Sequence, residues 1–579
     1  MISEILIVMI AAIAVTVIAE RRGIQAPLLL AAVGLAASFI PGLPRLELEP
    51  EIILTVVLPP LLFSAATEFS FVSFLRRLGS ILNLGVFLVA VTTGIVGAVA
   101  AAVVPGMLLP VALVLGAVVS PPDAVTAVAV GRKLKLPSAM MTVLKGESLI
   151  NDAAALTFFT FAVASVAGTH LFIQNIVVYL LYASIAGFLL GLVLGAVVHQ
   201  LRMPIPSASL ATVLTVVVPF AAYLLAEEMG ASGVLAVVAA GLSLGHTASD
   251  TRYDARIQEQ QFWRTVDALL EAFVFAYIGL QFRWVIADAG AGGVNVPELL
   301  LVSLVVLVAV IVVRIGWVYL TSIFSRWRAR VGAKQVAKLD QYLALPAEER
   351  AVKFERLERT AGRRGRLAQR IEQAREARMQ GGFQLMPAFT WQENAVISWT
   401  GMRGVVTLAA AAGVPLVTAS GAPFPGRDVI QVVAFVVTIG TLLVQGVTLP
   451  WLIRWLKIGA AGDEEAREKQ VELAEAIGHT ATVEVIAAYR DRQTDDAKRR
   501  MAEAMLSRME AQGGARVSAN SNDDGAVMAL AQEMLAARRA ALIKARDERR
   551  LDDEVMREAL EQMDLEQAVM ANWTPGRLR

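Results

Sequence analysis

The sequence of 579 residues contains no cysteine, and charged residues make up only 18% of it. Without cysteine, disulfide-stabilised folds and thiolate metal sites are excluded. The net charge of +1 provides no overall basic surface for nucleic acid, and we expect no such partner. Hydrophobic residues reach 56%, against about 45–50% in ordinary soluble proteins. These values predict a polytopic membrane protein.

The charge is concentrated in two segments. Residues 325–387 and 457–579 hold most of the Lys, Arg, Asp and Glu, whereas the rest of the chain is apolar. We therefore expect a transmembrane domain over 1–456, with a cytosolic loop at 325–387, and a helical cytosolic tail over 457–579. The tail can be a regulatory module or a solvated helical hairpin without a ligand, and its sequence identifies no ligand.

A transmembrane helix needs about 20 mostly apolar residues, and the sequence offers thirteen such segments. An odd total permits two six-helix units of opposite orientation joined by one helix, as in many secondary transporters. We predict an all-α membrane protein with two inverted six-helix repeats and discontinuous crossing helices. The predicted spans are 2–19, 25–41, 51–69, 80–103, 108–130, 142–167, 172–198, 206–227, 231–246, 267–285, 298–323, 391–413 and 428–453.

The orientation follows from Lys and Arg in the short loops, because cytoplasmic loops carry the excess. Loops on one side carry Arg21, Arg22, Arg76, Arg77, Arg132, Lys133, Lys135, Arg202, Arg252, Arg256 and Arg264. Loops on the other side carry Arg45 and Arg427, with Arg283 at the edge of a span. The loop 325–387, with fifteen basic and seven acidic residues, falls on the first side. The N-terminus is expected outside and the C-terminus in the cytoplasm.

The fifth span is expected to be broken in its middle, at Ser120-Pro121-Pro122-Asp123. Two adjacent prolines remove two helical N–H donors and disfavour helix just before them. The freed carbonyls need partners that lipid cannot supply, so the break must line a cavity. Asp123 can then face the positive N-terminal end of the second half-helix.

The sixth span carries acidic residues at membrane depth. Asp152 is predicted about 18 Å from the helix end near residue 140, close to the middle of the bilayer. Ser148 and Asp152 share a helix face, and Glu147 and Asn151 form a second pair beside them. Hydroxyl and carboxylate oxygens suit an alkali cation, and a desolvated carboxylate can hold a proton instead. Ionisable groups inside spans usually mark ion pathways.

The twelfth span carries Arg403 between Gly401 and Gly404, which allow local unwinding. In the six-one-six scheme this span corresponds to the fifth, so both helix-breaking motifs lie at matching positions. Arg403 needs a buried anion, and we expect Glu147 first and Asp123 second. Weaker site candidates are Glu68, Ser120, Thr126 and Arg314.

These motifs together resemble the bacterial Na⁺/H⁺ exchangers among the monovalent cation/proton antiporters. The matching stretches are Leu58–Phe63, Ser120–Val125, Glu147–Asp152 and Ile397–Ala411, within residues 1–456. The resemblance implies a homodimer in the bacterial inner (plasma) membrane that exchanges cytoplasmic Na⁺, K⁺ or Li⁺ for external H⁺. It implies no cofactor beyond the transported ions.

The resemblance also implies roles for individual residues. Asp152 is expected to exchange Na⁺ and H⁺ with Ser148 as a ligand, while Glu147 pairs with Arg403. Asp123 is expected to balance the half-helix dipoles. Asn151 stands where electrogenic relatives carry a second Asp, which favours electroneutral one-for-one exchange.

One departure concerns the crossing helix, where many relatives read Thr-Asp-Pro. Here Pro122 precedes Asp123, so the hydroxyl that contributes to the relatives' ion site is absent, although Ser120 and Thr126 lie near.

Two other classes of membrane protein are alternatives. An intramembrane aspartyl protease could use Asp123 and Asp152, but the spans lack the Tyr-Asp and Gly-x-Gly-Asp contexts of such enzymes. A cation channel usually assembles a filter from repeated carbonyl loops, and no glycine-rich filter is visible.

Overall fold

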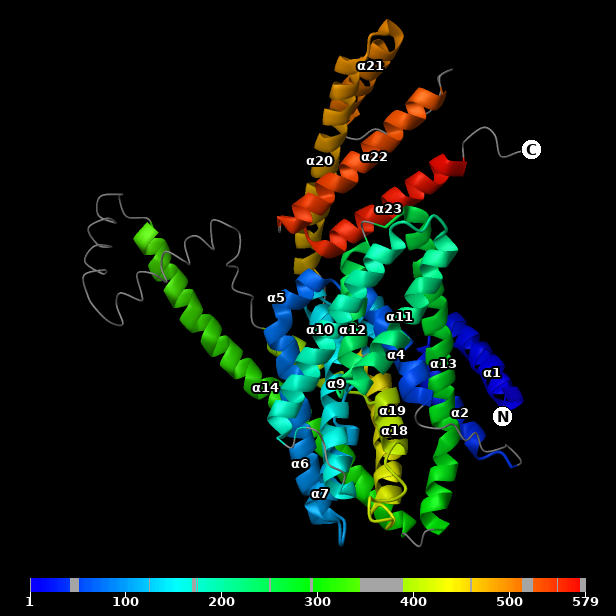
Figure 1. Cartoon of the computed structure of the whole chain (residues 1–579). Coiled ribbons are helices and arrows are strands. Elements are labelled where there is room, and N and C mark those ends of the chain that lie inside the picture. The colour runs from blue at the N-terminus through cyan, green and yellow to red at the C-terminus, as the bar shows by residue number, and fades with distance from the viewer. Residues whose placement is uncertain are drawn as a thin grey trace.

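The computed structural model is helical, and four helices of the C-terminal segment lie across one end of the main bundle (Figure 1). Among the described residues, the one strand-like pairing is an isolated bridge between Val417 and Pro423. The structure describes residues 2–41, 52–123, 125–168, 173, 175–248, 251–291, 295–343, 389–458, 461–512, 524–548 and 550–572.

Each of the thirteen predicted spans coincides with helical structure. Within the described residues, seven helices are long and apolar enough to cross a membrane, and four shorter apolar helices accompany them. The elements in span order are α1 (Ile2–Arg22), α2 (Ala26–Ser38), η1 (Ile53–Val57) with α4 (Leu58–Thr67), α5 (Phe71–Leu82) with η2 (Asn83–Phe87) and α6 (Leu88–Val103), α7 (Leu109–Val119) with α8 (Val125–Lys133), α9 (Ser138–Ala167), α10 (Ile176–Arg202), α11 (Ala208–Glu228), α12 (Gly233–His246), α13 (Tyr253–Ala291), α14 (Val296–Leu343), α17 (Trp391–Trp399) with α18 (Val405–Ala412), and α19 (Arg427–Trp455).

Two helices extend well beyond the predicted spans. Helix α13 begins at Tyr253, although the predicted span begins at 267, and α14 continues to Leu343, although its span ends at 323. Charged residues and glutamine are good helix formers, so a helix does not stop where its apolar stretch ends. The remainder of the predicted cytosolic loop, 344–387, lies outside the described residues.

The two interrupted helices are the fifth and twelfth spans, as predicted. Helix α7 ends at Val119 and α8 begins at Val125, with Pro121 and Pro122 between them. Helix α17 ends at Trp399 and α18 begins at Val405. The prolines cause the first break because they cannot donate backbone hydrogen bonds.

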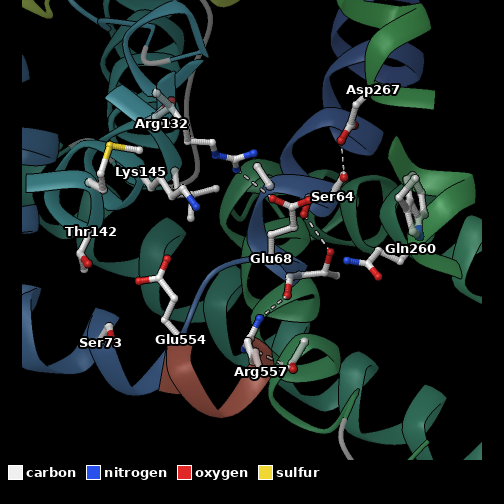
Figure 2. Close-up of a pocket in the computed structure, with 18 of the residues that line it drawn as sticks. Ser64, Glu68, Ser73, Arg132, Thr142, Lys145, Gln260, Asp267, Glu554 and Arg557 are labelled. Atoms are coloured by element: carbon white, nitrogen blue, oxygen red, sulfur yellow. Dashed lines mark hydrogen bonds and ion pairs between the residues drawn. The ribbon is translucent and has the colours of Figure 1, made fainter. Parts of the chain in front are cut away.

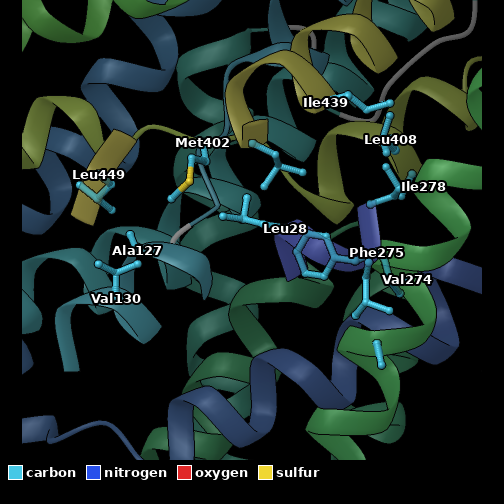
Figure 3. Packing of buried hydrophobic residues seen from close by; sticks show 14 of the residues in the cluster. Leu28, Ala127, Val130, Val274, Phe275, Ile278, Met402, Leu408, Ile439 and Leu449 are labelled. Carbon is cyan, nitrogen blue, oxygen red and sulfur yellow. The ribbon is translucent and has the colours of Figure 1, made fainter. Parts of the chain in front are cut away.

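Close packing of α2 against α13 depends on two glycines that face each other. A Cβ atom on Gly34 would lie 2.7 Å from the carbonyl oxygen of Ala276, and one on Gly279 would lie 2.6 Å from that of Ala31. Small residues let membrane helices approach in this way. Buried side chains from several elements, among them Leu28, Phe275 and Met402, then form a shared hydrophobic core around the second break (Figure 3).

The C-terminal segment contains α20 (Ala461–Arg492), α21 (Asp496–Gln512), α22 (Asp524–Asp547) and α23 (Asp553–Asn572). Helices α20, α22 and α23 share a hydrophobic core that includes Leu542 and Met556. Helix α23 also packs against α13 of the main bundle. Arg256 of α13 forms an ion pair with Asp564 of α23, so the segment is attached to the bundle by specific contacts.

Candidate functional site

The two helix breaks meet each other inside the bundle. The backbone N–H of Asp123 donates to the carbonyl oxygen of Met402 at 2.6 Å, which joins the first break to the second. Helix α18 packs against α7 as well. Each break therefore satisfies part of the hydrogen bonding that the other exposes, as a non-helical segment at membrane depth requires.

Asp123 lies between the N-terminal ends of the two second half-helices. Its Oδ1 atom accepts a hydrogen bond from the backbone N–H of Val125, the first residue of α8, at 2.9 Å. Its carboxylate also lies against Gly404, the N-cap residue of α18, where a Cβ atom would overlap it. Helix N-termini carry partial positive charge, so this carboxylate offsets two helix dipoles at once. The position agrees with the predicted role.

Arg403 donates hydrogen bonds at the C-terminal ends of the two first half-helices, α7 and α17. Its Nε atom donates to the carbonyl oxygen of Val119, the last residue of α7, at 3.0 Å, and its Nη1 atom donates to that of Gly401, just after α17. Helix C-termini carry partial negative charge and unsatisfied carbonyls. The buried guanidinium of Arg403 therefore offsets the two C-terminal ends, as Asp123 offsets the two N-terminal ends.

The predicted ion pair between Glu147 and Arg403 is wrong, because Arg314 of α14 occupies that place. The Arg314 guanidinium donates to the two carboxylate oxygens of Glu147 at 2.5 and 3.0 Å. It also donates to the carbonyl oxygen of Ile397, near the end of α17, at 3.0 Å. Both side chains are buried, and Arg403 is directed instead to the backbone carbonyls of the breaks. The second predicted partner of Arg403, Asp123, also makes no hydrogen bond to it among the described contacts.

Helix α9 brings Asn151 and Asp152 to the crossing. The Nδ2 atom of Asn151 donates to the carbonyl oxygen of Pro122 at 2.5 Å, which supplies a partner for one carbonyl of the first break. Asp152 is 8% exposed. Ser148 lies one turn away on the same face and is partly buried. In contrast to Glu147, Asp152 has neither a hydrogen-bond donor nor a basic partner among the described residues.

A cavity of about 1690 Å³ connects this crossing with the C-terminal helices. Asp123, Ser148 and Asp152 line it at the crossing, and residues of α23 such as Glu554 and Arg557 line it at the other end. Figure 2 shows this second end, with Glu554 and Arg557 near Lys145, Arg132 and Glu68. The carboxylate of Asp152 is thus connected to the face of the bundle that carries the C-terminal segment.

Two further carboxylates, which the sequence analysis did not single out, line the same cavity. Asp267 and Glu271 lie in the middle part of α13, one turn apart. The hydroxyl of Ser64 on α4 donates to Asp267 Oδ2 at 2.5 Å, a contact visible in Figure 2. The one-turn spacing of two acids was the available signal.

The weaker site candidates Glu68, Ser120 and Thr126 are either paired near the surface or lie away from the cavity. Glu68 forms an ion pair with Arg132 at 3.0 Å, with 39% of its side chain exposed. Ser120 donates its hydroxyl to the carbonyl oxygen of Ala117 at 2.9 Å. Ser120 and Thr126 are buried, but neither is among the residues that line the cavity.

Two broken helices that cross at membrane depth around a buried carboxylate define an ion-coupled secondary transporter. Residues 6–455 match the family model described as the transmembrane sodium/hydrogen exchanger, and the chain belongs to that family. The resemblance seen in the motifs is confirmed, and so is the predicted class, a cation/proton antiporter rather than an enzyme.

Similar proteins agree with this assignment. An uncharacterized Na⁺/H⁺ exchanger of Mycobacterium tuberculosis is 29% identical over 97% of this chain and 95% of its own length. A sodium, potassium, lithium and rubidium/H⁺ antiporter of Bacillus pumilus is 27% identical over 74% of this chain and 58% of its own length. The sodium proton antiporter MjNhaP1 of Methanocaldococcus jannaschii has the same fold, with a TM-score of 0.53 and 17% identity over 80% of this chain and 96% of that one.

Proposed function

We propose that the protein exchanges cytoplasmic Na⁺, or K⁺ or Li⁺, for external H⁺ by alternating access, with Asp152 binding cation and proton in turn. One observation supports this assignment most directly: Asp152 is a buried carboxylate that lines the cavity and has no basic partner in the described part of the chain. An unpaired charge in such a place is expensive. Asp152 therefore favours a bound cation or a proton, and the two compete for it.

The other two carboxylates of the crossing are already compensated. Glu147 has the guanidinium of Arg314, and Asp123 has the N-terminal ends of α8 and α18. Neither needs a transported ion to balance its charge. This difference selects Asp152 among the three as the exchanging group, with the hydroxyl of Ser148 on the same helix face as a ligand.

A single exchanging carboxylate supports electroneutral exchange of one cation for one proton. Asn151 cannot take up a proton in place of a second acid, and its amide is bound to the carbonyl oxygen of Pro122. The loaded site is neutral with either ion, and the neutral form is the one that crosses the low-dielectric membrane at little electrostatic cost.

The orientation in the bacterial inner membrane forms part of the proposal. The basic loops predicted to face the cytoplasm contact one another and the C-terminal segment: Lys133 donates to the carbonyl oxygen of Gly23, and Arg256 pairs with Asp564. We infer that this end is cytoplasmic and that the N-terminus lies outside. Helix α10 exposes many apolar side chains, which suit lipid or the second protomer of a homodimer.

The experiment that tests this function uses the purified full chain in vesicles with an internal pH indicator and an acid interior. Na⁺, K⁺ and Li⁺ are added in turn outside. We expect at least one of them to raise the internal pH, at a rate that an imposed membrane potential leaves unchanged. A cation channel would respond to the potential, and a chain that dissipates no pH gradient with any of the three ions would contradict the proposal.

The fit of Asp123 against Gly404 leads to a testable prediction. In Gly404→Ala, the added methyl group must displace the Asp123 carboxylate from the N-terminal end of α18. Because a carboxylate at a helix N-terminus stabilises by about 0.3–2 kcal/mol, we expect a loss of exchange rate in vesicles of roughly twofold to thirtyfold. Gly79→Ala is the matched control, since nothing lies within 4 Å of its new methyl group. Equal rates for both variants would refute the proposed role of Asp123.

The C-terminal segment contacts the bundle where the cavity opens toward α23. Arg557 of α23 donates to the carbonyl oxygens of Thr67 and Phe69, at the end of α4, at 3.2 and 3.3 Å. It also donates to that of Gly245, at the end of α12, at 3.4 Å. One guanidinium thus ties the ends of two bundle helices to the segment, at the mouth of the cavity. We propose that the docked segment slows exchange by restraining these helices.

For this regulatory contact we expect Arg557→Gln to loosen α23 and raise the maximal exchange rate about threefold to tenfold. This gain is smaller than the roughly 1.5–3 kcal/mol of hydrogen bonds to a charged group would give in full, because the pair of Arg256 and Asp564 still attaches α23. Trypsin should also cleave the C-terminal segment faster in this variant. Arg492→Gln serves as control, because Arg492 pairs with Glu533 inside the segment. A faster cleavage without any gain in exchange rate would show that the segment is attached but not regulatory.

A further inference from the structure

The proposed ion site lacks an oxygen ligand that a hydroxyl group beside Asp123 would supply. Pro122 stands where a hydroxyl residue would precede Asp123, and the nearby Ser120 uses its hydroxyl on the carbonyl oxygen of Ala117. Neither Ser120 nor Thr126 lines the cavity. The carboxylate of Asp123 also lines the cavity, but it lies against the N-terminal ends of α8 and α18. Ser148 and Asp152 are then the remaining cavity-lining side chains proposed above for the ion, and an alkali cation prefers more oxygen ligands than these two side chains offer.

Thr407 of α18 has the properties of a further ligand. It lines the same cavity as Ser148 and Asp152, and it is 0% exposed. Its hydroxyl oxygen has no hydrogen-bond partner in the part of the chain that the structure describes. The hydroxyls of Thr93, Thr251 and Thr438 are also buried without a partner, but these residues do not line the cavity.

The break before α18 explains why this hydroxyl is unpartnered. A threonine inside a helix usually donates to a carbonyl one turn earlier, as Thr157 does to Ala153 at 2.7 Å on α9. Thr407 lies in the first turn of α18, which begins at Val405, so no complete helical turn precedes it. The interruption that brings Gly404 to Asp123 therefore also frees the Thr407 hydroxyl.

Helix α18 packs against α9, the helix that carries Ser148 and Asp152. Val406 belongs to the same buried cluster as Leu149, Ile150 and Ala153, which surround Ser148 and Asp152 in the sequence of α9. A dry hydroxyl without a hydrogen-bond partner destabilises the fold. A cation next to Asp152 would recover that cost by accepting the hydroxyl oxygen as a ligand.

We propose that Thr407 is a cation ligand of this exchanger and supplies the oxygen that the residue before Asp123 does not. The inference rests on the proposed exchange at Asp152 and adds a residue to it. A residue that binds only the cation affects only the cation-loaded half of the cycle, because the protonated site does not use that residue as a ligand. Removing the hydroxyl should weaken cation binding and leave the proton-loaded half of the cycle intact.

The test compares Thr407→Val, which keeps the side-chain shape, with Thr407→Ser, which keeps the hydroxyl. In vesicles of the full chain we expect Thr407→Val to raise the KM for Na⁺ and Li⁺ about tenfold with little change in the maximal rate, as for loss of one contact to a charged group. Thr407→Ser should remain within about twofold of the unmodified chain. Thr157→Val is the matched control outside the cavity, and its KM should not change.

Thermal unfolding separates a ligand from a structural residue. Because the Thr407 hydroxyl has no partner to lose, Thr407→Val should melt at the same temperature or higher, whereas Thr157→Val loses a hydrogen bond and should melt lower. A melting temperature of Thr407→Val clearly below that of Thr157→Val would assign the residue a structural role. Thr407→Ala repeats the KM measurement if the valine variant folds poorly.

The outcomes distinguish this inference from the function on which it rests. If the unmodified chain exchanges no cation for protons, the proposed function fails. If it does exchange them and both Thr407→Val and Thr407→Ala show an unchanged KM for Na⁺, only the assignment of Thr407 is overturned.

Discussion

Asp152→Asn is expected to reduce cation/proton exchange to the background of vesicles without protein, a loss of at least about 100-fold. The amide cannot bind a proton and carries no charge to hold a cation, so neither half of the exchange cycle remains. The loss should be seen with Na⁺, K⁺ and Li⁺ alike, because all of them depend on the same carboxylate. The measurement is the rise of internal pH in acid-loaded vesicles.

The same variant should fold as well as the unmodified chain. Asp152 has no basic partner among the described residues, and its buried charge is costly, so the amide removes a penalty rather than a contact. Its melting temperature should be equal or higher. Asp428→Asn makes the same chemical change at an exposed position in the first turn of α19, outside the cavity, and should leave exchange unaffected. Wild-type exchange by Asp152→Asn would refute the assignment.

Breaking the buried pair of Glu147 and Arg314 is expected to have the largest effect on stability. In Arg314→Met the carboxylate of Glu147 stays buried without its partner, which typically destabilises by about 3–5 kcal/mol. The carbonyl oxygen of Ile397 loses the Arg314 guanidinium as a donor and keeps the hydroxyl of Thr400. We expect a strongly lowered melting temperature and poor recovery of folded protein, and the same for Glu147→Gln. Glu68→Gln, which removes an exposed pair with Arg132, should cost at most about 1 kcal/mol.

A double-mutant cycle identifies the true partner of Glu147. Because Glu147→Gln and Arg314→Met remove the same interaction, their combined effect should fall well short of the sum of the single effects. Glu147→Gln combined with Arg403→Met should be close to additive, since Arg403 binds the carbonyl oxygens of Val119 and Gly401. Strong coupling of Glu147 with Arg403 in place of Arg314 would contradict the observed pairing.

The fold was predictable because its main determinants are local. Apolar length indicates the spans, and Pro121-Pro122 and the glycines around Arg403 indicate where two of them break. The matching positions of those breaks predicted that they belong together, and the hydrogen bond from Asp123 to Met402 joins them. The bounds of α13 and α14 were missed because charged residues continue a helix without any apolar signal.

The partner of Glu147 was not predictable from local sequence. Either of two buried arginines, Arg314 or Arg403, could pair with Glu147. Arg403 does not, because its guanidinium donates to the carbonyl oxygens of Val119 and Gly401. A signal for Arg314 did exist, since it is the only charged residue inside its predicted span besides Glu298. A lone cation in an apolar helix must find an anion elsewhere in the fold.

The contribution of Thr407 was hidden for a related reason. In sequence it is one hydroxyl in a run of small apolar residues, and nothing marks it as different from a helical threonine that bonds to its own backbone. Only its place in the first turn after a break, together with the cavity beside it, reveals an unused oxygen. The contact of Arg557 with the ends of α4 and α12 likewise depends on tertiary structure.

Binding of Na⁺ to the purified protein, measured by calorimetry over a series of pH values, tests the competition at Asp152 most directly. If cation and proton compete for one carboxylate, the apparent Kd for Na⁺ rises about tenfold for each pH unit below the pKa of the site, and one proton is released for each Na⁺ bound. Asp152→Asn should show no such binding. A Kd for Na⁺ that is independent of pH, with no proton released, would contradict the account.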